Sequence, residues 1–322
     1  MRQFVKPTVV VSKCLEFEAC RYNGDKISDA TVRNLQPYVE FIPVCPEVEI
    51  GLSIPRETIR IVEQDGTQKL VQPSTGADLT EKMQQFSDVF LSSLPDVDGF
   101  ILKNRSPSCG TRDVKIYAGV GKAPTKGKGA GLFGSAVLAT FSHLAIEEEG
   151  RLSNFIIREH FFTQLFTIAH FKALKKKINM KALVEFQSDY KYLFMAYNQT
   201  KQKELGRIIA NQEKCPIDEV FANYEKTLYE LLKRTPRYTS NINVCQHIFG
   251  YFKNKLKKEE KDHFLSLLSK YAEKKIPLSS ILTILKSWAL RFEETYLLRQ
   301  TYFEPYPEVL VEITDSGKGR DY

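Results

Sequence analysis

The sequence lacks any uninterrupted hydrophobic run as long as a membrane-spanning helix requires, about 18 residues. The segment that ends at Cys14, MRQFVKPTVVVSKC, has too short an apolar stretch for a secretory signal peptide and leads directly into a strand-like run. We therefore expect a cytoplasmic protein with no membrane partner.

Cysteine is also sparse, with six residues in a chain of 322. That number is too small for a disulfide scaffold, and a reducing cytosol keeps thiols unpaired. The glycine-rich segment GVGKAPTKGKGAG (119–131) lacks the residue order of a Walker A phosphate loop. We expect it to form a basic surface loop, which can meet a phosphate only where the next helix begins.

The length predicts two domains, and a hydrophobic content of 43% is enough for real cores. Positive charge is concentrated in the second half. Residues 151–322 contain 29 Lys and Arg against 20 Asp and Glu, a net charge of +9, which leaves a net charge of −2 for residues 1–150. The second half therefore suits an anionic partner such as nucleic acid, or simply has a lysine-rich surface.

Residues 1–150 alternate short strand-like runs with helical ones. The expected strands are 8–12, 39–44 and 97–103, with a hairpin over 58–72 that turns at Asp65-Gly66. The expected helices are 30–38, 77–94 and 129–144. This alternation predicts a layered α/β domain with a mostly parallel, Rossmann-like sheet.

Residues 151–312 show helical spacing of apolar side chains and almost no strand pattern. They predict an all-α domain of roughly six or seven helices. The clearest segments are 151–177, 215–234, 243–258, 259–275 and 279–302. Residues 313–322 have the composition of a flexible tail.

Three cysteines follow predicted core strands. Cys14 ends TVVVSKC, Cys45 ends VEFIPVC, and Cys109 lies in LKNRSPSCG after the strand at 97–103. Ligands of open α/β sheets bind at the carboxyl ends of the strands, so these thiols are expected to share one site. Three thiolates suit zinc or an iron–sulfur cluster, and buried structural cysteines are the alternative.

The other three cysteines fit this pattern less well. Cys20, six residues after Cys14, lies where a fourth ligand is conceivable, although its role is left open. Cys215 precedes a proline at a helix start, and Cys245 lies on an apolar helix face. We interpret these two as structural.

The segments VSKCLEFEACRYNG, FIPVCPEVEIGLSIPR and LKNRSPSCG resemble the signature segments of the thiouracil desulfidase family over about residues 5–150. Residues 151–310 resemble the YbgA-type helical domain, notably in REHFFTQLFTIAHFK and YLLRQTYFEPYPEVL. The fused form resembles bacterial desulfidases of 4-thiouridine in transfer RNA. One departure is LEFEACRYNG, where relatives more often have a small-residue LxGxxxRYDG, so Glu16, Phe17 and Cys20 are expected to reshape the pocket for the base.

The resemblance implies a [4Fe-4S] cluster held by Cys14, Cys45 and Cys109, with a fourth iron open to the thiocarbonyl sulfur. It implies hydrolytic desulfidation of 4-thiouridine in transfer RNA, giving uridine and hydrogen sulfide. Glu47 is the candidate general acid/base, and Ser106 and Ser108 are candidate hydrogen-bond donors to the base or to cluster sulfurs.

Two groups of lysines are the candidate RNA contacts, because cations give affinity for the phosphate backbone. They are Lys172, Lys175, Lys176, Lys177, Lys253, Lys255, Lys257 and Lys258. Two alternatives remain open: desulfidation of free thiouracil bases or nucleosides, and a non-enzymatic RNA-binding or metal-sensing protein. The oligomeric state is also open.

Overall fold

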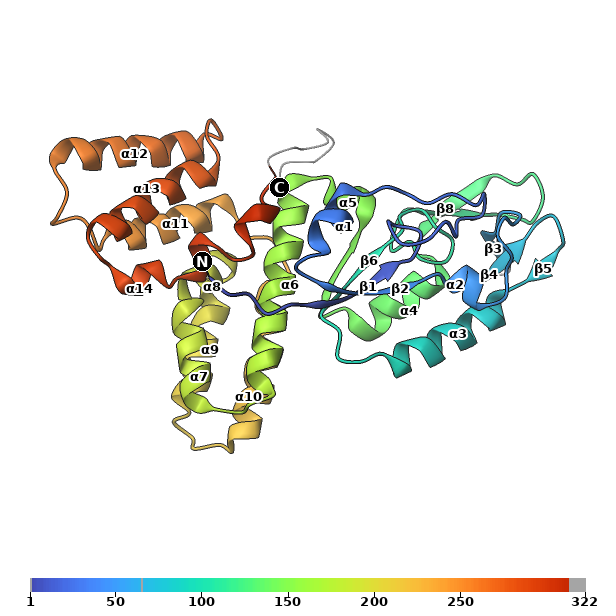
Figure 1. Cartoon of the computed structure of the whole chain (residues 1–322), viewed down its shortest axis with the longest axis horizontal. Coiled ribbons are helices and arrows are strands. Elements are labelled where there is room, and N and C mark those ends of the chain that lie inside the picture. The colour runs from blue at the N-terminus through green and yellow to red at the C-terminus, as the bar shows by residue number, and fades with distance from the viewer. Residues whose placement is uncertain (1, 65, 313–322) are drawn as a thin grey trace. The chain divides into compact units, whose positions relative to one another are not determined.

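The computed structural model describes residues 2–64 and 66–312 (Figure 1). The described chain divides into two compact units. The first runs from the N-terminus to Ala169 and is rejoined by the chain from Val309; the second is His170–Glu308. Among the described residues, none of the helices combines the length and the apolar character needed to cross a bilayer.

The first unit contains a four-stranded sheet and a five-stranded sheet. The four-stranded sheet has the order β2-β1-β6-β9, and all its strand pairs are parallel. Its strands are β1 (Thr8–Ser12), β2 (Glu40–Val44), β6 (Gly99–Leu102) and β9 (Ala145–Glu148). The helices of the unit are α1 (Ala30–Leu35), α2 (Pro46–Glu49), α3 (Thr80–Ser93), α4 (Leu132–Phe141), α5 (Glu149–Leu152) and the first part of α6 (Phe155–Lys175). The predicted α/β class with a parallel sheet is confirmed.

The centre of this sheet is fully apolar. Val9, Val10 and Val11 of β1 and Phe100 and Ile101 of β6 are all buried. Strands covered on both faces read as continuous hydrophobic runs, which is why TVVVS and GFIL show no alternation. This order places β2, β1 and β6 side by side, so their carboxyl ends lie at one edge.

The five-stranded sheet has the order β5-β4-β3-β7-β8. Its strands are β3 (Arg60–Gln64), β4 (Thr67–Gln72), β5 (Ala77–Asp78), β7 (Val114–Tyr117) and β8 (Thr125–Gly129). The predicted hairpin is confirmed by the antiparallel β3–β4 register, although Asp65 of its turn lies outside the described residues. The prediction of a loop over 119–131 is wrong in part, because residues 125–129 pair with β7.

The β8 strand forms because β7 supplies the apolar side chains. Val114 and Ile116 of β7 are buried, whereas residues 125–128 of β8 are exposed. Lys126 and Lys128 lie on this edge strand, and charge on an edge opposes pairing with another chain.

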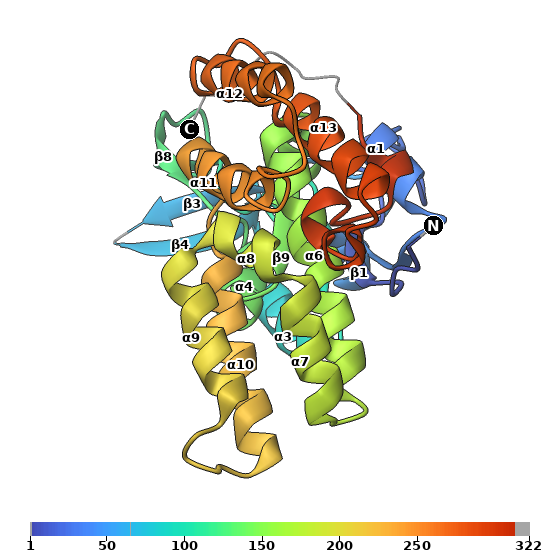
Figure 2. The same cartoon turned by 90° about the vertical axis from the view of Figure 1, so that its left-hand side faces the viewer.

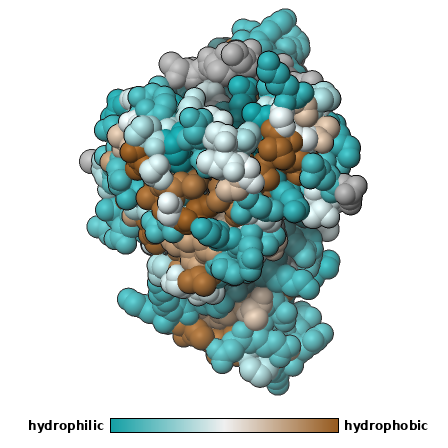
Figure 3. Space-filling model, turned by 90° about the vertical axis from the view of Figure 1, so that its right-hand side faces the viewer, coloured by the Kyte–Doolittle hydropathy of each residue, from teal (hydrophilic) through white to brown (hydrophobic). Residues whose placement is uncertain are grey.

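Figure 3, viewed from the right of Figure 1, shows mostly hydrophilic residues around a smaller hydrophobic area.

The second unit is helical, as predicted. After the end of α6 it contains α7 (Met180–Asp189), α8 (Lys191–Tyr197), α9 (Gln199–Ala210), α10 (Ile217–Leu232), α11 (Tyr238–Phe249), α12 (Lys258–Ala272), α13 (Leu278–Arg291) and α14 (Thr295–Leu298), with the 3-10 turns η1 (Thr301–Phe303) and η2 (Glu308–Leu310). Helices α9 and α10 lie side by side (Figure 2). Stacked aromatic rings fill its core, including Phe171 on Tyr224 and Phe249 on Phe264.

Two predicted helix ranges are wrong at their ends. The helix expected over 243–258 begins at Tyr238 and ends at Phe249, where Gly250 follows. The segment 279–302 is broken between α13 and α14, where Glu293 adopts a left-handed backbone. The division between the compact units falls within α6, and the expected domain boundary at residues 150 and 151 stays a prediction. The tail predicted for 313–322 lies outside the described residues.

Candidate active site

The three strand-end cysteines line one cavity. Cys14, Cys45 and Cys109 follow the neighbouring strands β1, β2 and β6, and all three face a hollow of about 790 Å³ within the first unit. Cys20 lines the same hollow. We call it the cysteine cavity. The topology therefore brings together side chains that are 31 and 64 residues apart in sequence.

The four thiols interact with one another and with buried hydroxyls. A hydrogen bond with the Cys14 thiol, together with burial, raises the pKa of Cys20 to about 11, although one with Cys45 opposes it. A hydrogen bond with Cys20 raises the pKa of Cys45, and burial raises the pKa of Cys109. The raised pKa values keep the thiols of Cys20, Cys45 and Cys109 neutral, and a metal would displace their protons on binding.

Soft sulfur ligands of this kind favour zinc or iron–sulfur chemistry. The donors come from separate segments and share one cavity, so the donor set fits such a centre. Across residues 2–64 and 66–312, no three Cys, His, Asp or Glu side chains are already spaced as a metal-binding group.

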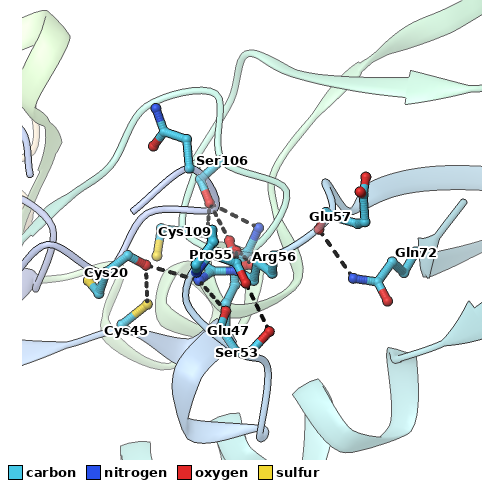
Figure 4. Close-up of polar contacts among 12 residues, drawn as sticks. Cys20, Cys45, Glu47, Ser53, Pro55, Arg56, Glu57, Gln72, Ser106 and Cys109 are labelled. Atoms are coloured by element: carbon cyan, nitrogen blue, oxygen red, sulfur yellow. Dashed lines mark hydrogen bonds and ion pairs between the residues drawn. The ribbon is translucent and has the colours of Figure 1, made fainter. Parts of the chain in front are cut away.

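Glu47 lies beside the thiols, at the start of α2, and is fixed by four hydrogen bonds. Its Oε2 accepts from Arg56 Nε at 2.9 Å and from Arg56 Nη2 at 2.6 Å. Its Oε1 accepts from Ser108 Oγ at 2.8 Å and from Ser106 Oγ at 3.4 Å. Figure 4 shows Glu47, Arg56 and Ser106 beside the sulfur atoms of Cys20, Cys45 and Cys109. The structure thus joins the predicted acid/base, both predicted serines and the cysteines in one site.

The serines also shape the loop that carries Cys109. Ser106 Oγ accepts from the backbone N–H groups of Ser108 and Cys109, at 3.2 and 3.1 Å. Ser12, two residues before Cys14, accepts from Lys103 N at 2.9 Å and also hydrogen-bonds the Cys109 thiol. These hydroxyls are buried or half-buried, so they are polar groups available inside the cavity wall.

Two glycines let α4 pack directly against this loop. Gly131 N donates to Gly110 O at 2.7 Å, and Gly134 N donates to Ser108 O at 2.9 Å. A Cβ at Gly131 would lie 2.5 Å from Ser108 O, and one at Gly134 would lie 2.3 Å from Gly110 O. The small residues that the sequence places at this helix start are therefore required by the close approach of the two backbones.

Two buried carboxylates at the end of β9 hold the same loop. Glu148 Oε1 accepts from Thr111 N at 2.6 Å and from Thr111 Oγ1 at 2.9 Å. Glu149 accepts from Asn104 N at 2.7 Å and from Lys103 Nζ at 2.5 Å. Neither residue was predicted to have a role, because β9 was not predicted from the sequence and its acidic run EEE resembles the exposed end of a helix.

The lining of the cysteine cavity is rich in positive charge. Eight cations line it against two carboxylates, Glu47 and Asp113. The cations are Lys13, Arg21, Arg56, Arg60, Lys103, Arg105, Lys115 and Lys128. Of these, Arg21, Arg60, Arg105 and Lys115 form no ion pair with the described part of the chain. The cavity is therefore suited to an anionic substrate.

Two tyrosines accompany the cations. Tyr22 is 43% exposed and lies beneath the Arg21 guanidinium, whose Cζ is 5.5 Å from the ring centre. Arg60 Cζ lies 4.8 Å from the centre of the Tyr117 ring. Flat rings beside cations are suited to stacking on a nucleobase. Of these residues, only Tyr117 had a signal in the sequence, the alternation in VKIY.

The predicted lysine groups belong to the second unit. Lys172, Lys175, Lys176 and Lys177 lie at the end of α6, and Lys253, Lys255, Lys257 and Lys258 lie between α11 and the start of α12. Lys175 pairs with Glu225 at 2.7 Å and Lys255 with Glu294 at 2.5 Å. Part of this charge is therefore neutralised locally, and the RNA role of these lysines stays a prediction. Cys245 is buried against Tyr302, in agreement with a structural role.

Comparison with known proteins identifies both parts of the chain. Residues 9–149 match the family described as 2-thiouracil desulfurase, and residues 191–307 match a family described as a protein of unknown function (DUF1722). The chain is 34% identical over 111 residues to the uncharacterized protein YbbK of Bacillus subtilis (strain 168), covering 32% of this chain and 73% of that protein. It is 26% identical over 156 residues to the uncharacterized protein YbgA of Escherichia coli (strain K12), covering 48% of this chain and 92% of that protein.

One similar solved structure is a [4Fe-4S]-dependent thiouracil desulfidase, TudS, with 26% identity and a TM-score of 0.37 over 46% of this chain and 93% of that chain. The match to the family falls on the unit that carries the cysteine cavity. This chain therefore belongs to the 2-thiouracil desulfurase family, whose members are enzymes that remove sulfur, and it carries a YbgA-like helical domain behind the catalytic one.

Proposed function

We propose that the chain hydrolyses 4-thiouridine in transfer RNA, using a [4Fe-4S] cluster held by Cys14, Cys45 and Cys109. The observation that carries the proposal is one cavity in which strand-end thiols, a fixed carboxylate and a surplus of cations meet. The reaction balances as thiouridine plus water giving uridine plus hydrogen sulfide, with no net electron transfer. When bound, the cluster supplies a Lewis-acidic iron that polarises the C–S bond and takes up the departing sulfur.

The protein's own groups supply the proton transfers. Glu47 accepts a proton from the attacking water and returns it to the departing sulfur. Arg56 holds Glu47 Oε2 through two N–H donors, which fixes the direction of the carboxylate. Ser108 Oγ, 2.8 Å from Glu47 Oε1 and fully buried, keeps the other oxygen of the carboxylate in place.

The charge of the lining supports a nucleotide in RNA as the substrate. A free thiouracil base is neutral and needs no cation, whereas each nucleotide of an RNA carries a phosphate. Arg21, Arg60, Arg105 and Lys115 are available to bind such phosphates, and Tyr22 can stack on the exposed base. The net charge of +9 in residues 151–322 adds long-range attraction for the same polyanion.

Free thiouracil remains the second candidate substrate, because the family description names that base. A test of both is to purify the protein without oxygen, measure iron and sulfide, and then supply either bulk thiolated transfer RNA or free 4-thiouracil. The proposal expects a brown protein that releases sulfide from RNA at much lower substrate concentration than from the free base. Release from free base alone would refute the RNA substrate, and a colourless zinc protein would refute the cluster.

A further inference from the structure

Cys20 is a buried cysteine whose polar neighbours are other cysteines. Its side chain is fully buried, and it lines the cysteine cavity in the loop between β1 and α1. Its thiol hydrogen-bonds the thiols of Cys14 and Cys45. Figure 4 places the sulfur of Cys20 next to that of Cys45, with that of Cys109 nearby. Cys20 is therefore a fourth sulfur at a site for which only three were assigned.

The position of Cys20 is fixed by the backbone around it. Arg56 Nη1 donates to Cys20 O at 3.0 Å, and Cys45 Sγ donates to the same oxygen at 3.8 Å. Arg56 is the residue that also holds Glu47, so one guanidinium ties Cys20 to the candidate acid/base. Cys20 N donates to Glu18 O at 2.9 Å, within a loop closed by Ile27 N donating to Cys14 O at 2.8 Å. The thiol is presented by an ordered loop.

Ordinary burial does not account for this environment. A buried structural cysteine usually behaves as a small apolar residue among apolar neighbours. Cys245 follows the usual pattern: it is buried in the helical unit, and its Sγ lies 3.7 Å from the phenol oxygen of Tyr302. Cys20 instead adjoins two thiols, a guanidinium-bound carbonyl and a charged cavity. Sulfur donors gathered in this way are what a soft metal centre requires.

We propose that Cys20 supplies a fourth, replaceable thiolate to the cluster, which caps the remaining iron while no substrate is bound. The inference rests on the proposed function, because it takes the cluster as bound by Cys14, Cys45 and Cys109. Clusters with four irons usually have four cysteine ligands, and four cysteines line one cavity here. Where the thiocarbonyl sulfur takes this coordination place, the Cys20 thiolate would be released and would take a proton from water, leaving hydroxide.

The cap has a measurable consequence for oxidation. An iron without a protein ligand is lost when the cluster is oxidised: [4Fe-4S]²⁺ gives [3Fe-4S]⁺, Fe²⁺ and one electron, which ferricyanide accepts. A thiolate from Cys20 retains that iron. Anaerobically reconstituted wild-type protein is compared with Cys20→Ser and Cys20→Ala, and Cys215→Ala, outside the cavity, is the matched control. Iron, sulfide and circular dichroism are measured first, to establish equal loading and folding.

The expected result is that ferricyanide produces the three-iron paramagnetic resonance signal on the order of tenfold faster in both Cys20 variants than in wild type. Cys215→Ala should follow wild type. Free 4-thiouracil, titrated by its effect on the cluster absorbance, should bind more tightly to Cys20→Ala, because no thiolate competes for the iron.

Equal rates of three-iron formation in wild type and both loaded Cys20 variants would overturn the inference while leaving the proposed function intact. Complete loss of iron in Cys20→Ser, the outcome expected for Cys45→Ser, would also overturn it, since Cys20 would then be an obligatory ligand. A wild-type protein that binds no iron or sulfide would refute the proposed function itself, and the inference with it.

Discussion

Replacing Glu47 tests the proposed proton transfer most directly, and the structure shows which replacement to use. Glu47→Ala would leave the Arg56 side chain, only 4% exposed, without its carboxylate. Removing one partner of a buried ion pair costs about 3–5 kcal/mol. That loss is a large part of the 5–15 kcal/mol by which a typical domain is stable. A dead Glu47→Ala variant could therefore be a misfolded one.

Glu47→Gln avoids that difficulty. The amide oxygen can still accept from Arg56, and the amide nitrogen can donate to the Ser108 hydroxyl, so the shape of the site is kept. Only the ability to take a proton is lost. General acid–base catalysis contributes about 10²–10⁴-fold, so turnover should fall by that factor, equivalent to about 3–5 kcal/mol in the barrier.

The assay measures sulfide release from thiolated transfer RNA and from free 4-thiouracil, at equal iron content. Glu63→Gln is the matched control, since Glu63 is a carboxylate of β3 that pairs with Lys126 and does not line the cavity. The control should keep wild-type turnover. A loaded Glu47→Gln protein whose turnover stays within a few-fold of wild type would remove Glu47 from the mechanism.

Four further predictions follow from single contacts. Cys109→Ala should abolish the brown absorbance of the anaerobic protein, and an unchanged spectrum would refute its assignment as a ligand. Gly134→Ala places a Cβ 2.3 Å from Gly110 O and should lower the free energy of unfolding, measured by urea titration, by about 1–3 kcal/mol, with loss of iron. Wild-type stability of this variant would refute the tight contact. Lys115→Gln should raise the KM for thiolated RNA, leave that for free 4-thiouracil unchanged, and lower the salt dependence of RNA binding by a slope of about 0.7–0.9; equal effects on both substrates would contradict a phosphate contact. Burial lowers the pKa of His160 to about 4 from 6.5, so the unfolded chain binds this proton first as the pH falls, and the free energy of unfolding decreases. Between pH 7 and pH 5 the wild type should lose about 2 kcal/mol more of its unfolding free energy than His160→Gln. Equal losses in the two proteins would refute this prediction.

The meeting of three distant cysteines could be predicted because the rule concerns strand ends and does not depend on strand order. Cys14, Cys45 and Cys109 each follow a strand of the parallel sheet, and carboxyl ends of parallel strands lie at one edge. The order β2-β1-β6, which makes them adjacent, comes from packing of the whole sheet and is not encoded locally. The sequence left the role of Cys20 open, because this residue lies in an irregular loop between β1 and α1 and not at a strand end.

The strands β7 and β8 of the five-stranded sheet were not predicted from the sequence. The strand VKIY has the alternation typical of a half-buried strand, and could have been found. Its partner TKGKG has no β-branched residue after Thr125 and two glycines, so nothing local favours a strand. It becomes one because β7 offers an unpaired edge, a tertiary effect. The place of Lys128 in the cavity wall was missed for this reason.

The two sheets contribute different residues to the site, so variants in the two sheets should have different kinetic effects. The parallel sheet supplies the thiols, and α2, which follows β2, supplies Glu47. Tyr117 and the cations Arg60, Lys115 and Lys128 lie on β3, β7 and β8 of the other sheet. Changes at the parallel sheet's edge should therefore alter the rate of the chemical step for every substrate. Changes on β7 and β8 should alter only which substrates bind, because a charge that contacts phosphate has nothing to contact on a free base.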